Sequence, residues 1–208
     1  MADYTLELAN TLIVGMSGSG KSTFAYRYLL NAPAACRFLF DDLGRAATRL
    51  NLRPCYTSAE LEAALASRWV IFNPARMFPD GDYKAAFRFF CDWVYAASQR
   101  GPGKKLVLVD EIWQWQDRED IPRELDRLVR LGREEDTELV SATQSPSLIN
   151  ASITGQSTEL VCFRLDEPKE LACVRRLGAD AEAVQGLPLG SFLSWNRLTR
   201  TKLSGKLF

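Results

Sequence analysis

Hydrophobic residues in this chain occur in two kinds of segment: short continuous apolar runs, and longer segments in which apolar residues recur every three or four positions. Continuous runs are typical of strands that are buried on both faces of a parallel sheet. They predict strands at 11–14, 36–42, 68–74, 106–111, 137–144 and 157–165. The segment 190–196 is a candidate for a last strand.

Segments with helical periodicity lie between these runs. In the clearest, 82–97, one face carries Tyr83, Phe87, Phe90, Trp93, Val94 and Ala97. Further helices are predicted at 21–31, 58–67, 120–132 and 166–178, the last of them capped by Asp166 and closed by Gly178. Because strands alternate with helices, we predict a three-layer α/β domain with a mostly parallel central sheet over residues 1–196, followed by a basic C-terminal tail, 197–208.

Composition narrows the classes of protein. A chain of 208 residues with 47% hydrophobic and 25% charged residues is typical of one globular domain. No apolar run approaches the roughly 20 residues that span a membrane. The stretch 1–15 has no basic start and only a short apolar run, so we do not expect a signal peptide. These features favour a cytoplasmic location.

The chemical repertoire is restricted. The five cysteines are scattered without a C-x-x-C pair, which favours small buried hydrophobes in a reducing compartment. The absence of histidine excludes histidine acid–base catalysis and histidine metal sites. Because 26 basic residues balance 26 acidic ones, a nucleic-acid partner would have to bind a local basic patch.

A phosphate-binding loop is predicted where the first strand gives way to a helix, in the stretch "VGMSGSGKST". Gly15, Gly20, Lys21 and Ser22 match G-x-x-x-x-G-K-[ST]. Glycines let successive amides form an anion nest, and the following helix presents its free N–H groups to phosphate. The expected ATP-binding residues are Gly15, Ser17, Gly18, Ser19, Gly20, Lys21, Ser22 and Thr23. Lys21 would reach the β- and γ-phosphates and Ser22 would ligate Mg²⁺; a glycine-rich turn without a ligand is the alternative.

Polar residues at two predicted strand ends complete a candidate hydrolytic site. In "LVLVDE", Asp110 is a candidate Mg²⁺ ligand and Glu111 is placed to polarise a water against the γ-phosphate. The alternative is that both acids only cap the strand or pair with lysine. In "SATQSP", Gln144 is a candidate for contacting the γ-phosphate or the attacking water, and an ordinary polar strand end is the alternative.

These segments resemble the FtsK/HerA superfamily of DNA-pumping ATPases. The resemblance rests on "GMSGSGKST", "LVLVDE", "RLGREEDTELVSATQSPSLI", "LVCFRL" and "GADAEAVQGLPLGSFLSWNR", and covers residues 12–196. The loop is common to many P-loop proteins, whereas the Asp-Glu strand followed by "ATQ-x-P" is more specific. Without a membrane or extra DNA-binding domain, the chain looks most like the small genome-packaging ATPases of tailless, often membrane-containing, double-stranded DNA viruses.

The resemblance implies a RecA/ASCE-like P-loop ATPase that uses Mg²⁺ and ATP, with Lys21, Glu111 and Gln144 in the catalytic site. It also implies a homo-oligomeric ring, expected to be a hexamer, around double-stranded DNA, with viral capsid or membrane-vertex proteins as partners. Such a protein works in the host cytoplasm or with the virion. Family members insert a neighbour's arginine into each ATP site. Arg133, nine residues before Ala142, matches it, and Arg130 is the competing candidate.

Three features of the sequence each allow two interpretations. Arg123, Arg127 and Arg130 share a helix face that either lines an interface or DNA channel, or is solvated and pairs with Glu124, Asp126 and Glu134. The stretch 113–115, "WQW", either contacts DNA or a neighbouring subunit, or packs in the core. The tail residues Arg197, Arg200, Lys202 and Lys206 either contact phosphates or belong to a disordered solvated tail.

Three other functions remain open. A small-molecule kinase shares the phosphate loop but needs an acceptor pocket and usually an arginine-rich lid, which the sequence does not clearly contain. A nucleotide-binding assembly or adaptor protein would use ATP only to lock a conformation, with negligible turnover. A filamentous-phage extrusion factor belongs to the same superfamily but commonly carries a membrane span.

Overall fold

The structure, a computed structural model, describes residues 10–207. Residues 1–9, most of the stretch considered for a signal peptide, lie outside the described part. The described residues form two compact units. The first unit contains 31–109 and 122–139, and the second contains 10–30, 110–121 and 140–207. No helix among residues 10–207 is long and apolar enough to cross a membrane.

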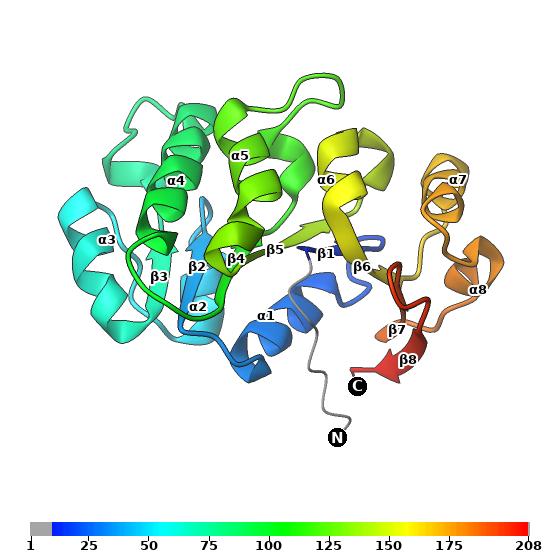
Figure 1. The fold of residues 1–208 in the computed structure, drawn as a ribbon. Helices are drawn as coiled ribbons and strands as arrows, with labels where there is room; N and C mark the ends of the chain where they lie inside the picture. The colour runs from blue at the N-terminus through cyan, green and yellow to red at the C-terminus, as the bar shows by residue number, and fades with distance from the viewer. Residues whose placement is uncertain (1–9, 208) are drawn as a thin grey trace. The chain divides into compact units, whose positions relative to one another are not determined.

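The strands form one sheet in the order β3-β2-β4-β5-β1-β6-β7-β8 (Figure 1). Strand β2 pairs in parallel with β3 and β4, and β1 pairs in parallel with β5 and β6. Strands β7 and β8 continue the sheet in antiparallel pairing from β6. The predicted α/β domain with a mostly parallel sheet and helices on both sides is confirmed.

The first unit carries β2 (Cys36–Phe40), β3 (Trp69–Phe72), β4 (Lys105–Val109) and the first three residues of β5 (Thr137–Thr143). Its helices are α2 (Arg45–Leu50), α3 (Ser58–Ala64), α4 (Tyr83–Ser98) and α5 (Arg123–Leu131), and α4 and α5 lie side by side (Figure 1). Rings of Phe40, Phe72, Phe87 and Phe90 pack together in its core. The apolar face predicted for α4 is thus a core face.

The second unit carries β1 (Asn10–Val14), β6 (Ser157–Phe163), β7 (Ser191–Asn196) and β8 (Lys202–Lys206). Its helices are α1 (Lys21–Asn31), α6 (Ala151–Gln156), α7 (Pro168–Arg176) and α8 (Ala181–Gln185). Helices α1 and α6 lie on opposite sides of the strands (Figure 1). One part of its core is Leu12, Val14, Leu160, Cys162, Val174 and Val184. All the apolar side chains of β1 and β6 are buried, as their continuous runs predict.

The C-terminal segment differs from the disordered tail that was one interpretation of its sequence. Strand β8 pairs with β7, and the Leu207 amide donates to the Gly190 carbonyl at 2.8 Å. Gly190 in turn donates to the carbonyl of Ser19 at 3.1 Å, and Arg27 of α1 donates to the Leu207 carbonyl at 2.8 Å. The segment therefore braces the turn between β1 and α1.

Short elements are the main difference from the sequence prediction. Helices α2, α6 and α8 have six, six and five residues, too few to show a helical repeat of apolar positions. The predicted cap of α7 is also wrong: Glu167 occupies the N-cap, and Asp166 instead accepts a hydrogen bond from Arg164. Four cysteines are buried and Cys36 is half-buried, all as free thiols, which fits the expectation of small hydrophobes.

Candidate functional site

The glycine-rich loop joins the carboxyl end of β1 to the start of α1. The Met16 amide donates to the Arg164 carbonyl at 2.8 Å and the Gly15 amide to the Thr143 carbonyl at 3.3 Å, which fixes the loop to the ends of β6 and β5. Gly18 and Gly20 have φ angles of 73° and 116°, a region that favours glycine. Because α1 begins at Lys21, the loop leads directly into the positive end of an eleven-residue helix.

The loop fits a phosphate ligand. Ser17 and Gly18 are exposed at its tip, whereas Ser19 is buried. Among the residues that the structure describes, the Ser19 hydroxyl is enclosed without a hydrogen-bond partner. An unsatisfied buried hydroxyl costs about 1–3 kcal/mol, so a ligand that offers acceptor oxygens would be favoured here.

Close packing at Gly15 gives a stability prediction. A Cβ at Gly15 would lie 2.6 Å from the Phe163 Cβ and 2.7 Å from the Ser19 Oγ, both attached to firmly held backbone. We expect Gly15→Ala to lower the free energy of unfolding by about 1–3 kcal/mol, the usual cost of overpacking. Urea denaturation checks this value. Gly155→Ala is the control, because its Cβ would meet nothing and alanine in a helix should stabilise α6 by about 0.5–1 kcal/mol. Equal stability of the two variants would contradict the packing argument.

Lys21 is a buried cation facing the loop. Its side chain is only 5% exposed, and its Nζ donates to the Met16 carbonyl at 3.0 Å. The Nζ also lies 4.0 Å from the Glu111 Oε1. Burial lowers the pKa of Lys21, while the charges of Glu111 and Asp110 act in the opposite direction. A buried ammonium with such incomplete compensation favours an additional anion beside it.

Ser22 and Asp110 present two oxygen ligands side by side. The Ser22 hydroxyl donates to the Asp110 Oδ2 at 2.8 Å, and the Glu111 amide donates to Oδ1 at 3.0 Å. Mg²⁺ prefers oxygen ligands, and proteins usually hold it with one or two carboxylates together with waters and substrate phosphates. The pair therefore fits a Mg²⁺ ion that arrives with a nucleotide, as the sequence predicts.

Glu111 is held in a strained backbone conformation immediately after Asp110. Its φ and ψ of 46° and 48° are left-handed, which for a residue other than glycine costs about 1–3 kcal/mol. The carboxylate is fixed on one side, because its Oε2 accepts from the Trp113 Nε1 at 2.9 Å and the Gln144 amide at 3.2 Å. With 28% of the side chain exposed, it can still contact a water. Such a carboxylate can act as a general base.

Gln144 follows the last residue of β5, Thr143, as predicted. Its backbone amide binds Glu111, and its side chain makes no hydrogen bond within residues 10–207. The amide side chain is thus available beside the Glu111 carboxylate. Lys21, Ser22, Asp110, Glu111 and Gln144 all come together in the second unit.

The tryptophans after Glu111 have separate roles. Trp115 is buried, which confirms core packing for that residue. Trp113 instead holds the Glu111 carboxylate, a contact that the sequence analysis missed. The only sequence signal for it is an indole two positions after the acid.

The predicted arginine candidates lie in the first unit. Arg133 is exposed on the 3-10 helix η4 (Gly132–Glu135). On α5, Arg130 donates to Asp126 at 2.7 Å, one of the pairings that the solvated-face interpretation expects. Arg127 is directed to α4, where it pairs with Asp92 and its guanidinium lies 4.4 Å from the centre of the Tyr95 ring. The arginine face is therefore divided between packing and ion pairs.

The sheet order, the loop between β1 and α1 and the acid pair after β4 define a P-loop NTPase fold. No family model matches the sequence, and no curated protein matches it. Solved structures do match. The genome packaging NTPase B204 from Sulfolobus turreted icosahedral virus 2, in complex with ATP-gammaS, has a TM-score of 0.75 at 17% identity, covering 95% of this chain and 96% of its own.

Two further structures have the same fold. B204, the DNA-packaging ATPase from Sulfolobus turreted icosahedral virus, matches with a TM-score of 0.72 at 18% identity over 96% of this chain and 98% of its own. VirB4 of Thermoanaerobacter pseudethanolicus matches at 0.68 and 13% identity over 96% and 89%. The resemblance to packaging ATPases inferred from the sequence is thus confirmed at the level of the fold.

Proposed function

We propose that this protein is an ATP-hydrolysing double-stranded DNA translocase that packages a viral genome into a capsid. The observation that carries the proposal is the convergence of Lys21, the Ser22–Asp110 pair, Glu111 and Gln144 at one phosphate-binding loop. Support comes from two B204 structures of similar fold, one described as a genome packaging NTPase with ATP-gammaS and the other as a DNA-packaging ATPase.

Nucleotide binding follows from the loop. Amides of residues 15–20 and the start of α1 surround the β- and γ-phosphates, and Lys21 neutralises part of their charge. The Ser22 hydroxyl and the Asp110 carboxylate would hold Mg²⁺. When bound, Mg²⁺ lowers the charge on the phosphate oxygens.

Hydrolysis requires a general base, and a motor also requires a residue that responds to the loss of the γ-phosphate. Lys21 exchanges Glu111 for phosphate when ATP binds, which leaves the Oε1 of Glu111 to accept a proton from the attacking water. Trp113 and the Gln144 amide keep Oε2 in position during this step. The Gln144 side chain contacts the γ-phosphate and responds to its loss. No covalent intermediate is needed.

The proposed translocase works as a ring of subunits around DNA. Arg133 is the residue we assign to the neighbouring ATP site, since its position before the strand that ends in "SATQ" matches the arginine of the family that the sequence resembles. There it would stabilise the negative charge that grows on the transferred phosphoryl group. A hexameric ring at a capsid or membrane vertex, acting in the host cytoplasm or on the virion, would contact mainly DNA phosphates and be independent of sequence.

The test is steady-state ATPase activity with and without double-stranded DNA over a range of protein concentrations. If the ATP site is shared between subunits and the motor depends on DNA, specific activity should rise with protein concentration and on addition of DNA. Arg133→Ala should remove the concentration dependence, whereas Arg130→Ala should retain it. Activity independent of DNA and concentration would instead indicate a self-contained enzyme such as a kinase, and negligible turnover under all conditions would indicate an assembly or adaptor protein.

A further inference from the structure

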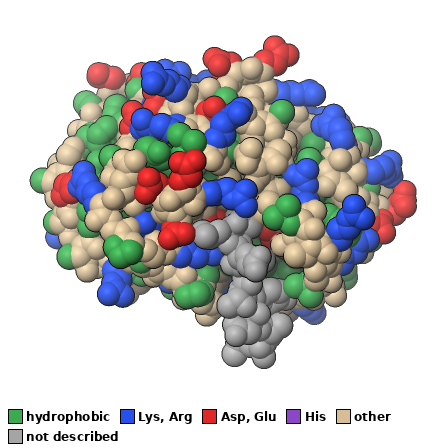
Figure 2. All heavy atoms as spheres, in the orientation of Figure 1, with side chains coloured by type: hydrophobic (Ala, Val, Ile, Leu, Met, Phe, Trp, Pro, Cys, Tyr) green, Lys and Arg blue, Asp and Glu red, His purple; other side chains and the backbone are tan. Residues whose placement is uncertain are grey.

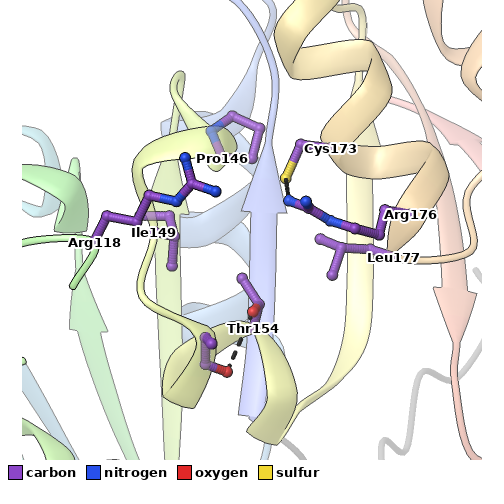
Figure 3. Close-up of a pocket in the computed structure, with 8 residues that line it drawn as sticks. Arg118, Pro146, Ile149, Thr154, Cys173, Arg176 and Leu177 are labelled. Atoms are coloured by element: carbon purple, nitrogen blue, oxygen red, sulfur yellow. Dashed lines mark hydrogen bonds between the residues drawn. The ribbon is translucent and has the colours of Figure 1, made fainter.

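A small cavity in the second unit lies among segments that follow two of the catalytic residues (Figure 3). Its volume is about 220 Å³, and it is lined by Arg118, Pro146, Ile149, Ala151, Thr154, Cys173, Arg176 and Leu177. Arg118 follows Glu111 in the chain, Pro146 and Ile149 follow Gln144, and the remaining wall comes mainly from α6 and α7. Ligand sites for drug-sized molecules measure about 300–1,000 Å³, so this one suits a single small group.

Two arginines direct positive charge into this cavity. In Figure 3 the guanidinium groups of Arg118 and Arg176 extend from opposite walls toward the space between them. Within the part of the chain that the structure describes, the Arg118 guanidinium makes no hydrogen bond or ion pair. Among residues 10–207, the guanidinium of Arg176 donates only to the Cys173 Sγ, at 3.7 Å. The adjacent Arg175, by contrast, pairs with Glu182 at 2.9 Å.

The other lining groups do not neutralise these charges. Burial raises the pKa of the Cys173 thiol, so the thiol stays neutral at neutral pH. Thr154 donates its hydroxyl to the Ala151 carbonyl, and Pro146, Ile149 and Leu177 are apolar. Two like charges beside an apolar wall repel one another, and an anion between them would relieve that repulsion.

The pattern is local, since the visible face of the protein carries Lys and Arg side chains that are widely spread and mixed with Asp and Glu (Figure 2). At this cavity, within the described part of the chain, two guanidinium groups share one space and neither has a carboxylate partner. Guanidinium is also the side chain best matched to phosphate, because its planar donors bind two oxygens at once.

Hydrogen bonds connect the segments of the cavity wall that follow the catalytic residues in the chain. Gln116 donates to the Leu148 carbonyl at 3.0 Å and accepts from the Asn150 amide at 2.9 Å. Asn150 also donates its side-chain amide to the Arg118 carbonyl at 2.8 Å. On the other side the buried Glu170 of α7 accepts from both the amide and the hydroxyl of Ser147, each at 2.7 Å. The loop after Gln144 is thus held between the segment after Glu111 and α7.

We propose that Arg118 and Arg176 form a subsite for one phosphodiester group of the DNA backbone, and that its occupancy is transmitted to Glu111 and Gln144 through the Gln116–Asn150 and Ser147–Glu170 contacts. This inference rests on the proposed function, because it names a DNA contact of the same motor. A phosphate held here draws Arg118 and Arg176 toward each other and, through these contacts, shifts the segments that follow the base and the γ-phosphate contact, so DNA binding accelerates hydrolysis. Binding at this subsite depends on the phosphate charge and not on the base sequence.

The test compares the double variant Arg118→Gln/Arg176→Gln with Arg175→Gln, a neighbouring arginine that already has a carboxylate partner. Binding of a fluorescent double-stranded DNA is measured over a range of salt concentrations, with ATPase activity at saturating DNA. The double variant should bind DNA about tenfold to a hundredfold more weakly, the effect of losing charged hydrogen bonds. Its slope of log affinity against log salt should be smaller by about 0.9, the value for one phosphate contact. DNA stimulation of its ATPase should be lost, and Arg175→Gln should retain both properties.

The outcomes separate this inference from the proposed function. If the wild type neither binds double-stranded DNA nor is stimulated by it, both fail. If the wild type does both and the double variant matches Arg175→Gln in salt slope and stimulation, only the subsite is overturned. If the double variant loses oligomer formation while the monomer's salt slope is unchanged, the arginines bind a carboxylate of a neighbouring subunit, and the subsite is again overturned. Thermal unfolding of each variant shows that the compared proteins are folded.

Discussion

Glu111→Gln should reduce ATP turnover by about 10²–10⁴-fold, the usual contribution of a general base, while ATP affinity stays within a few-fold of the wild type. Glutamine has the shape of glutamate and keeps one acceptor oxygen for the Trp113 indole and the Gln144 amide, but it cannot take a proton from water. The contact between Lys21 and Glu111 is replaced by phosphate in the bound state, so its loss should not weaken binding. Phosphate release and nucleotide titration, measured on the same preparation, check both statements.

The matched variant is Trp113→Phe, which keeps a ring next to Glu111 and removes the indole donor at 2.9 Å. It should lower turnover far less than Glu111→Gln, because the base remains and only one of its two restraints is lost. A Glu111→Gln protein with wild-type turnover would show that the carboxylate is not the base. Loss of ATP binding in that variant would show that Glu111 acts mainly as a partner of Lys21.

The sequence predicts well those parts of the site whose residues lie close together along the chain. The loop and the start of α1 are set by glycines at fixed spacing and by a lysine and a hydroxyl next to them, and all these residues lie within one turn and one helix. Asp110 and Glu111 follow a run, β4, whose five residues are all buried, and the ends of parallel strands meet at one edge of the sheet. Their position beside Ser22 therefore follows from topology alone.

The parts that escaped prediction depend on partners distant in the chain. Trp113 and Gln144 meet at one carboxylate oxygen of Glu111, which periodicity cannot reveal. Arg127 could have faced solvent, but Asp92 and Tyr95 on α4 attract it. The cavity arginines come from a loop and from α7, and their shared position exists only in the folded chain. The C-terminal strand β8 is polar and mostly exposed, so its sequence resembles a solvated tail, although its backbone pairs with β7.

Lys21 combines a binding role with a cost to stability. Burial holds the pKa of Lys21 in the folded protein below the ordinary value of 10.5, which applies to the unfolded chain. At a pH between the folded-state and the unfolded-state pKa, the unfolded chain therefore binds more protons than the folded one. Stability of the nucleotide-free protein should therefore rise with pH through that window, as lysine loses its proton. Bound phosphates favour the charged form and raise the pKa again. ATP affinity should accordingly fall as pH rises through the lowered pKa of Lys21, and binding there should take up a proton.

Lys21→Met tests this reasoning, because methionine keeps the unbranched chain and removes the charge. We expect ATP to bind at least about tenfold to a hundredfold more weakly, the effect of losing a charge-assisted hydrogen bond to phosphate. The nucleotide-free variant should be more stable than the wild type and should lose the rise of stability with pH, since no buried ammonium remains. Calorimetric titration with ATP at several pH values and urea denaturation without ATP provide the two measurements. A variant that binds ATP normally, or that is destabilised and keeps the pH dependence, would show that Lys21 has a structural role in the loop and does not supply charge for phosphate.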